Sequence, residues 1–198
     1  MSRLTRTESQ ARTRRQLVTT AQELFLADGY ATTSLEKVAD AAGYSKGAVY
    51  SNFRNKDELC LAVLDAIHES QASRMAASLE TAETMEELLD GLLSWAESNV
   101  GDQAWTALEV EFATNVRRDE RIRHELAVRD KQIRDALASL LGAHAERLGI
   151  TLPLPASDCA TALLSLGIGL GVQRAVDPEI PVRVLPDIIR LLASRTAP

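Results

Sequence analysis

The 198-residue chain is long enough for one domain or two small ones, and its 45% hydrophobic content suffices for a buried core. Aromatic residues make up only 4%, and Ala and Leu dominate, which favours helices packed on helices and therefore an all-α fold. The net charge of −6 argues against a nucleic-acid partner, but residues 1–56 carry nine Lys/Arg against five Asp/Glu, and residues 57–198 carry thirteen against twenty-three. A basic head on an acidic body is what a DNA-binding domain joined to a second domain would show.

The sequence also argues against secreted and membrane proteins. Cys60 and Cys159 stand far apart and without metal-binding or redox spacing, so we expect two buried thiols in a reducing compartment. No apolar run reaches the roughly 18 residues that a membrane helix needs, and the polar, basic N-terminus is not a signal peptide. We therefore expect a soluble, cytoplasmic protein without membrane contact.

The first predicted helix runs from about Ser9 to Ala27, because its apolar residues recur at helical spacing, and Gly29 ends it. Ahead of this helix, residues 1–8 are polar and basic, with Arg3 and Arg6. Two interpretations of this segment remain open: a disordered leader, or an arm that touches phosphates or the minor groove.

Two short helices are predicted within Thr33–Asn55. Thr33 and Glu36 stand in capping-box register, so the first helix should start at Thr33. Gly43 should stop it, because glycine adopts the left-handed conformation without steric cost, and Ser45 is a ready N-cap for the second helix. Two short helices joined by a tight turn are typical of a helix-turn-helix, although an ordinary helical hairpin gives the same pattern.

Two stretches closely resemble the DNA-binding signature of the TetR family of bacterial transcriptional repressors. They are the runs Ala21–Ser34 and Gly43–Leu59. The likeness covers about residues 10–60, whereas the remainder resembles the family only in length and helical character. The resemblance implies an N-terminal three-helix helix-turn-helix domain at residues 1–56 and a C-terminal helical effector-binding and dimerisation domain at residues 57–198. It also implies a homodimer that binds a palindromic DNA operator and is released by a small-molecule effector.

The predicted recognition helix, Ser45–Phe53, is short enough to lie in the major groove with its first turn toward the bases. Gly47 would let the backbone approach closely, Lys46 is a candidate for base or phosphate contact, and the Tyr50 hydroxyl can donate to a phosphate. Packing or turn geometry is the alternative for Gly47 and Tyr50, and a solvated charge is the alternative for Lys46 and Lys56. The resemblance implies DNA contacts at six positions: Thr33, Ser45, Lys46, Gly47, Tyr50 and Lys56.

A long helix is predicted for Lys56–Leu79, with Asn55 as its N-cap and Glu58 at its third position. Lys56 at the start of this helix and Thr33 at the start of an earlier one would offer further groups to the DNA backbone. Five more helices are expected in the body: at 85–100, after Asp102, from Asp119, from Ser157 to Val176, and between Val182 and Ala193.

The stretch Ala160–Val172 carries no charge, and a helix that is apolar all round must be buried on every side. The family resemblance implies that the last two long helices form a four-helix interface with a partner chain, and this stretch fits that role. The glycines of Gly167–Gly171 lack a preceding strand and the spacing of a dinucleotide-binding loop, so close helix packing is the better interpretation.

The few large aromatic residues of the body are predicted on neighbouring helices. They could pack in the core, or they could line a mostly apolar effector pocket with few polar groups. The pocket candidates are Trp95, Asn99, Trp105, Phe112 and His124. The resemblance implies a small molecule that lowers operator affinity, but no residue identifies it.

The sequence shows no catalytic, metal-binding or cofactor-binding pattern. The three histidines lack metal-ligand spacing, and there is no Gly-x-Ser-x-Gly elbow or P-loop, so we expect no enzyme, no metal and no cofactor. His144 falls on the apolar stripe of its helix and should be a core or interface histidine. Two other functions remain open: an activator or architectural protein that uses the same DNA-binding head, and a small-molecule-binding helical dimer without specific DNA binding.

Overall fold

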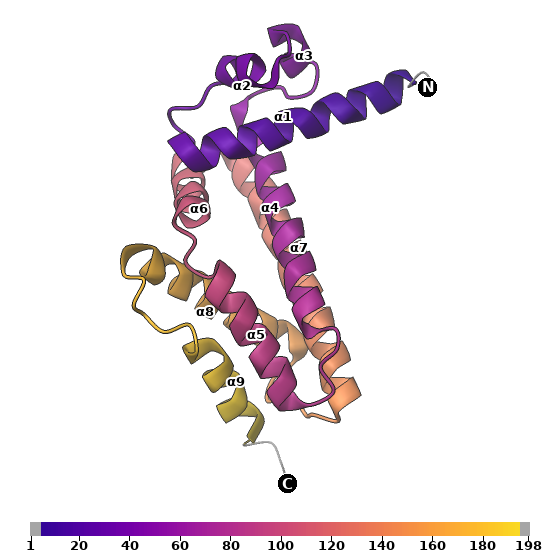
Figure 1. Cartoon of the computed structure of the whole chain (residues 1–198), viewed down its shortest axis with the longest axis vertical. Helices are drawn as coiled ribbons and strands as arrows, with labels where there is room; N and C mark the ends of the chain where they lie inside the picture. Colours follow the sequence, from indigo (N-terminus) through magenta and orange to yellow (C-terminus); the bar gives the residue numbers. More distant parts are fainter. Residues whose placement is uncertain (1–4, 195–198) are drawn as a thin grey trace. The chain divides into compact units, whose positions relative to one another are not determined.

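The structure of the chain is a computed structural model that describes residues 5–194 (Figure 1). Within that range all regular structure is α-helical, which confirms the predicted class. The helices are α1 (Arg6–Asp28), α2 (Leu35–Ala42), α3 (Lys46–Tyr50), α4 (Lys56–Leu79), α5 (Met85–Asn99), α6 (Gln103–Val116), α7 (Glu120–Leu148), α8 (Ala156–Val176) and α9 (Val184–Ser194). Arg3 lies outside the described residues, and Arg6 begins α1.

The described residues form two compact units, each held together by contacts within itself. The first unit contains residues 5–69 together with Ala107–His124, and the second contains Ser70–Thr106 together with residues 125–194. This grouping is not the sequence division at residue 56, because part of α6 belongs with the N-terminal helices. The domain boundary at residue 56 therefore stays a prediction.

In the first unit, α1 packs on α2 and α2 packs on α3 (Figure 1). Its core is formed by fully buried apolar side chains from each of these helices, from the loop after α3 and from α4. They include Leu17, Ala21, Phe25, Val38, Ala39, Val49, Phe53, Leu59 and Val63. Arg14 covers this core at one end, because its guanidinium lies 4.1 Å from the centre of the Phe53 ring and donates to the Asn52 carbonyl at 2.6 Å. Burial of apolar side chains from α1, α2 and α3 together is what fixes the helix-turn-helix pair as one unit.

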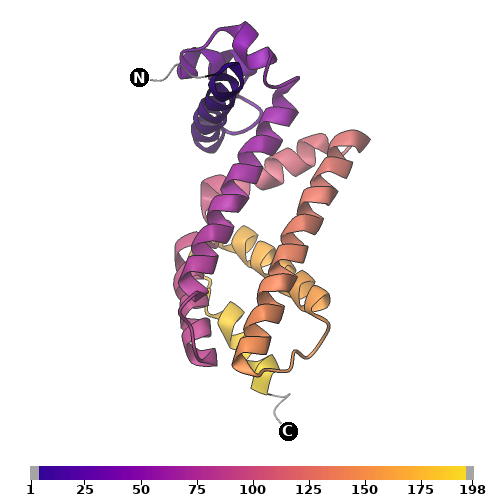
Figure 2. The ribbon, with the colours of Figure 1, turned by 90° about the vertical axis from the view of Figure 1, so that its right-hand side faces the viewer.

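In the second unit, α9 packs on α5 and also contacts α8, as the turned view shows (Figure 2). The core here consists of Leu79, Leu92, Ala96, Val182 and Leu185. His144 accompanies this core: one ring nitrogen lies 2.9 Å from the Leu140 carbonyl and the other 3.4 Å from the Leu79 carbonyl. The prediction of a core or interface histidine agrees with these hydrogen bonds on the core side, although the ring is only partly buried.

Several predicted helix ends are confirmed by their hydrogen bonds. Gly43 ends α2 with φ +71°, and the Ser45 hydroxyl accepts from the Ala48 N–H at 3.2 Å. The α4 bounds are as predicted, and Asn55 Oδ1 accepts from the Glu58 N–H at 2.8 Å. Pro186 lies in the first turn of α9, where its missing N–H has no intrahelical partner to lose.

Other helix ends differ from the predictions. Helix α1 begins earlier than Ser9, because Thr5 and Glu8 form a capping box that extends it into the segment interpreted as either a leader or an arm. Helix α2 begins at Leu35 rather than Thr33, because Ser34 is the N-cap, and its hydroxyl accepts from the Lys37 N–H at 3.1 Å. Helix α3 ends at Tyr50, three residues short of the predicted Phe53.

Two expectations about apolar character and burial are wrong in part. Helix α8 is long and apolar enough to cross a membrane by length and composition alone. Only 22% of its most apolar 18-residue stretch is buried within the chain. One such helix is weak support for a membrane span, since core helices of soluble proteins pass the same test. Cys60 is buried as expected, but Cys159, in the first turn of α8, is only partly buried.

Candidate nucleic-acid interface

The first turn of α3 is exposed, and its backbone is fixed by local capping. Ser45, Lys46 and Gly47 are all exposed, whereas Val49 on the opposite side is fully buried. A Cβ atom on Gly47 would meet only the Ser45 hydroxyl oxygen, at an ordinary 3.8 Å. The packing of the chain itself therefore does not require a glycine at position 47, so the missing side chain leaves space on the outer surface.

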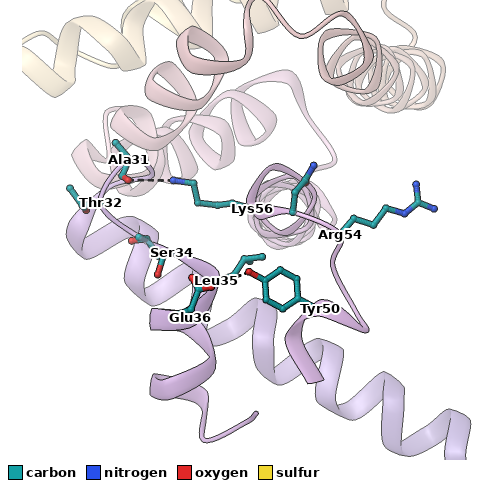
Figure 3. Close-up of a pocket in the computed structure, with 10 residues that line it drawn as sticks. Ala31, Thr32, Ser34, Leu35, Glu36, Tyr50, Arg54 and Lys56 are labelled. Carbon is teal, nitrogen blue, oxygen red and sulfur yellow. Dashed lines mark hydrogen bonds between the residues drawn. The ribbon is translucent and has the colours of Figure 1, made fainter. Parts of the chain in front are cut away.

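Beside α3 lies an open cleft of about 410 Å³, formed where α2 and α4 begin (Figure 3). Tyr50 of α3 also lines it, and Arg54 lies just before α4 with its side chain directed outward (Figure 3). The lining residues are Ala31, Thr32, Thr33, Ser34, Leu35, Glu36, Tyr50, Arg54, Asn55 and Lys56. Helix N-termini present unpaired N–H groups and a partial positive charge, so two of them beside an arginine favour an anion.

Tyr50 is 51% exposed, and its hydroxyl donates to Glu36 Oε1 at 3.0 Å. The pKa of the Glu36 carboxyl is lowered, first by its hydrogen bond with the backbone N–H of the same residue and then by the Tyr50 hydroxyl. The same contact raises the pKa of Tyr50, because the neighbouring carboxylate disfavours a phenolate. Tyr50 is therefore accessible, but its hydroxyl is already hydrogen-bonded to an acid.

Lys56 lies at the cleft with its ammonium group directed to the loop after α1 (Figure 3). Its Nζ donates to the Tyr30 carbonyl at 2.9 Å and to the Ala31 carbonyl at 3.3 Å. The same atom lies 4.1 Å from the centre of the Tyr30 ring, which adds a cation–π contact. Lys56 is only partly exposed, so its first role is to hold this loop.

Thr33 is placed differently from the sequence expectation. Its side chain is 1% exposed, and its hydroxyl donates to the Gly29 carbonyl at 2.9 Å. Its N–H donates to the Tyr30 carbonyl, so neither group is directed at the cleft. The hydroxyl at the start of α2 is that of Ser34, which the sequence did not single out. Three hydroxyl residues precede Leu35, and only Thr33 has a glutamate three positions later, so the capping-box pattern indicated Thr33.

The loop after α1 is held from its other side by α6. Glu111 accepts from the Tyr30 N–H at 2.8 Å and from the Ala31 N–H at 2.9 Å. The Phe112 ring meets the Tyr30 ring edge-on, with centroids 5.2 Å apart, and the Tyr30 hydroxyl donates to Asp57 Oδ1. Burial, followed by the Asp57 contact, raises the pKa of Tyr30 well above its ordinary value. The role of Glu111 was missed, because no local signal links residues 80 positions apart.

The five predicted effector residues divide between the two units. Trp95, Asn99 and Trp105 belong to the second unit, and Phe112 and His124 belong to the first. Asn99 is buried and donates to the Trp95 carbonyl at 2.6 Å, and Trp95 packs against the second core. His124 is exposed. Neither unit therefore contains all five of the predicted effector residues.

Comparison with known sequences agrees with this geometry. Residues 17–63 match the sequence model of the tetR family of bacterial regulatory proteins, and residues 81–195 match that of the C-terminal part of BetI-type transcriptional repressors. The chain belongs to the TetR family. It is a transcriptional regulator with a helix-turn-helix DNA-binding domain, and its family consists of regulators rather than enzymes.

Individual relatives of this TetR-family regulator are similar over different lengths. The regulator TtgR of Pseudomonas putida is 41% identical over 78 residues, which are 39% of this chain and 37% of TtgR. The matched stretch therefore spans less than half of that relative. The repressor Rv1474c of Mycobacterium tuberculosis is 25% identical over 87% of this chain and 88% of its own length. A solved regulator from Rhodococcus shares the fold, with a TM-score of 0.70 and 20% identity over 93% of this chain and 99% of its own.

Proposed function

We propose that this regulator is a homodimeric repressor that binds a palindromic operator with one helix-turn-helix in each half-site and is released by a small-molecule effector. The observation that carries the proposal is the exposed first turn of α3, Ser45–Gly47, on a helix whose last residue, Tyr50, lines a cleft that suits a phosphate. A recognition helix needs its first turn open to the base edges, and the flanking phosphate contacts fix its register.

The DNA contacts divide into two kinds in this proposal. Ser45, Lys46 and Gly47 face the groove, with Lys46 reaching a base or a phosphate. Tyr50, Arg54 and the N–H groups at the starts of α2 and α4 bind phosphate in the cleft, and Ser34 takes the position expected for Thr33. Lys56 adds its charge near the cleft while it holds the loop after α1.

Dimerisation is proposed through α8 and α9. These helices leave apolar side chains exposed in the single chain: Ile168, Val172 and Val176 on α8, and Ile188 and Leu191 on α9. A Cβ atom placed on Gly167 or Gly169 would meet nothing within 4 Å, which leaves room for a neighbouring helix to approach closely. Exposed apolar surface of this kind marks a site of contact with another protein chain, because its burial there removes it from water.

The effector is proposed to bind in the acidic body, with Trp95, Asn99 and Trp105 as the first residues to test and Phe112 and His124 of the first unit as the next. A first compound to test is choline, because a Saccharomonospora viridis protein of this fold was solved in complex with choline. Tryptophan faces suit a quaternary ammonium group. A shift in operator affinity on adding choline, measured at fixed salt, would identify it as an effector.

The decisive experiment selects binding sequences from a pool of random duplexes at two salt concentrations, with light scattering to determine the mass of the protein–DNA complex. The proposal predicts an enriched palindrome bound by two chains. Weak binding without enrichment, lost at the higher salt, would contradict it. A reporter with the selected sequence then separates a repressor, which lowers output, from an activator, which raises it.

A further inference from the structure

The cleft beside α3 contains a group that opposes an anion. Among the ten residues that line it, Glu36 is the one carboxylate, and it is partly exposed. A DNA phosphate in this cleft would lie close to a like charge, which costs binding free energy. A cleft with two helix N-termini and an arginine therefore includes one side chain that weakens the function proposed for it.

Glu36 also holds the hydroxyl that a phosphate would use. The Tyr50 hydroxyl donates to Glu36 Oε1 at 3.0 Å, across the gap between α2 and α3 (Figure 3). A hydroxyl has one proton to donate, so Tyr50 can donate to Glu36 or to a phosphate, but not to both. DNA binding through Tyr50 therefore requires the exchange of this hydrogen bond.

We propose that Glu36 is an affinity-lowering residue, whose carboxylate competes with the DNA phosphate for the cleft and for the Tyr50 hydroxyl. The inference rests on the proposed DNA binding and adds to it a residue that sets how tightly the head binds. Because phosphate contacts carry no base information, Glu36 lowers affinity for all sequences alike and leaves the preferred sequence unchanged.

The chain offers a matched control for this proposal. Asp40 is an exposed carboxylate on the same short helix, does not line the cleft and is not the acceptor of the Tyr50 hydroxyl. Asp40→Asn and Glu36→Gln change the net charge of the head equally. Glu36→Ala removes both the charge and the hydrogen-bond acceptor, with Asp40→Ala as its control.

The test measures fluorescence anisotropy of the full-length protein on a labelled duplex of the selected operator and on a scrambled duplex. Glu36→Gln should tighten binding about threefold per head and so about tenfold for a dimer. The reason is that each head loses one repulsive contact between the Glu36 carboxylate and a DNA phosphate, in surroundings of intermediate dielectric constant. Glu36→Ala should tighten it at least as much on both duplexes, and Asp40→Asn and Asp40→Ala should change it much less. Equal effects at positions 36 and 40, or weaker binding by Glu36→Ala, would overturn the proposal.

A second measurement isolates the competition for the hydroxyl. In the wild-type protein, Tyr50→Phe removes a hydrogen bond to phosphate in the complex and also a hydrogen bond to Glu36 in the free protein, and the two losses partly offset each other. In the Glu36→Ala background only the phosphate bond is lost, so Tyr50→Phe should reduce the affinity for DNA more there than in the wild-type protein. Equal losses in the two backgrounds would overturn the competition. Failure of the proposed function is separate: the wild-type protein would then bind the selected and scrambled duplexes equally, whatever the variants do.

Discussion

The loop Gly29–Thr33 and the segment Ser45–Tyr50 lie in the same compact unit, and both contain residues expected to contact DNA, but they use their polar groups differently. In the loop, the backbone groups of Tyr30 and Ala31 are bonded to Glu111 and Lys56, and the Thr33 hydroxyl is bonded to Gly29. In the segment, Ser45 and Lys46 are exposed. A family signature therefore mixes residues that build the interface with residues that are free to touch the partner.

The largest expected effect separates the two lysines of the signature. Lys56 lies in the first turn of α4, where a cation is disfavoured by the helix dipole, so its bonds to the loop must outweigh that cost. We expect Lys56→Ala to lower the free energy of unfolding by about 3 kcal/mol, because two carbonyls lose a charged donor. Lys46→Ala, its control, should leave stability unchanged and weaken DNA binding. Urea unfolding that gave equal stabilities for the two variants would remove the distinction.

A smaller loss of stability is expected at the contact between α6 and the loop. Glu111→Ala leaves the N–H groups of Tyr30 and Ala31 without their partner and should cost about 2 kcal/mol. Val110→Ala, which changes an exposed side chain on the same helix, is the control and should cost little. Amide hydrogen exchange should show faster exchange at Tyr30 and Ala31 in the first variant. Unchanged exchange there would mean that the loop does not depend on Glu111.

The next effect tests which hydroxyl belongs to the interior. Thr33→Val keeps the shape of the side chain and removes one buried hydrogen bond, so it should cost about 1 kcal/mol of stability. Ser34→Ala removes the α2 cap and one hydroxyl at the cleft, at a similar cost of about 1 kcal/mol. DNA affinity should fall more for Ser34→Ala than for Thr33→Val. The opposite order of affinities would restore Thr33 as the phosphate contact.

The smallest effect on stability is expected at Gly47. Alanine is a better helix former than glycine, and its methyl group has room, so Gly47→Ala should raise stability by about 0.5 kcal/mol. The same methyl group stands where DNA would approach, so binding should weaken. A variant that is more stable and binds as tightly as the wild type would show that position 47 does not face DNA.

The signals that predicted the fold correctly were local. Gly43, Ser45, Asn55, Asp102 and Asp119 all act at helix ends, where a side chain bonds to a backbone group within three residues or a glycine allows a positive φ. Local signals also misled: Thr33 has capping-box spacing, but its burial beside Gly29 moved the cap to Ser34. The role of Glu111 depends on a contact between distant parts of the chain, and no periodicity in the sequence indicates it.

The most direct test of DNA recognition by the exposed turn of α3 is a competition titration of the selected duplex against a scrambled duplex of equal length at physiological salt. We expect the wild-type dimer to prefer the selected duplex by about a thousandfold or more, as specific DNA-binding proteins do. Lys46→Ala should reduce affinity for the selected duplex. Equal binding of both duplexes by the wild-type protein would contradict the account.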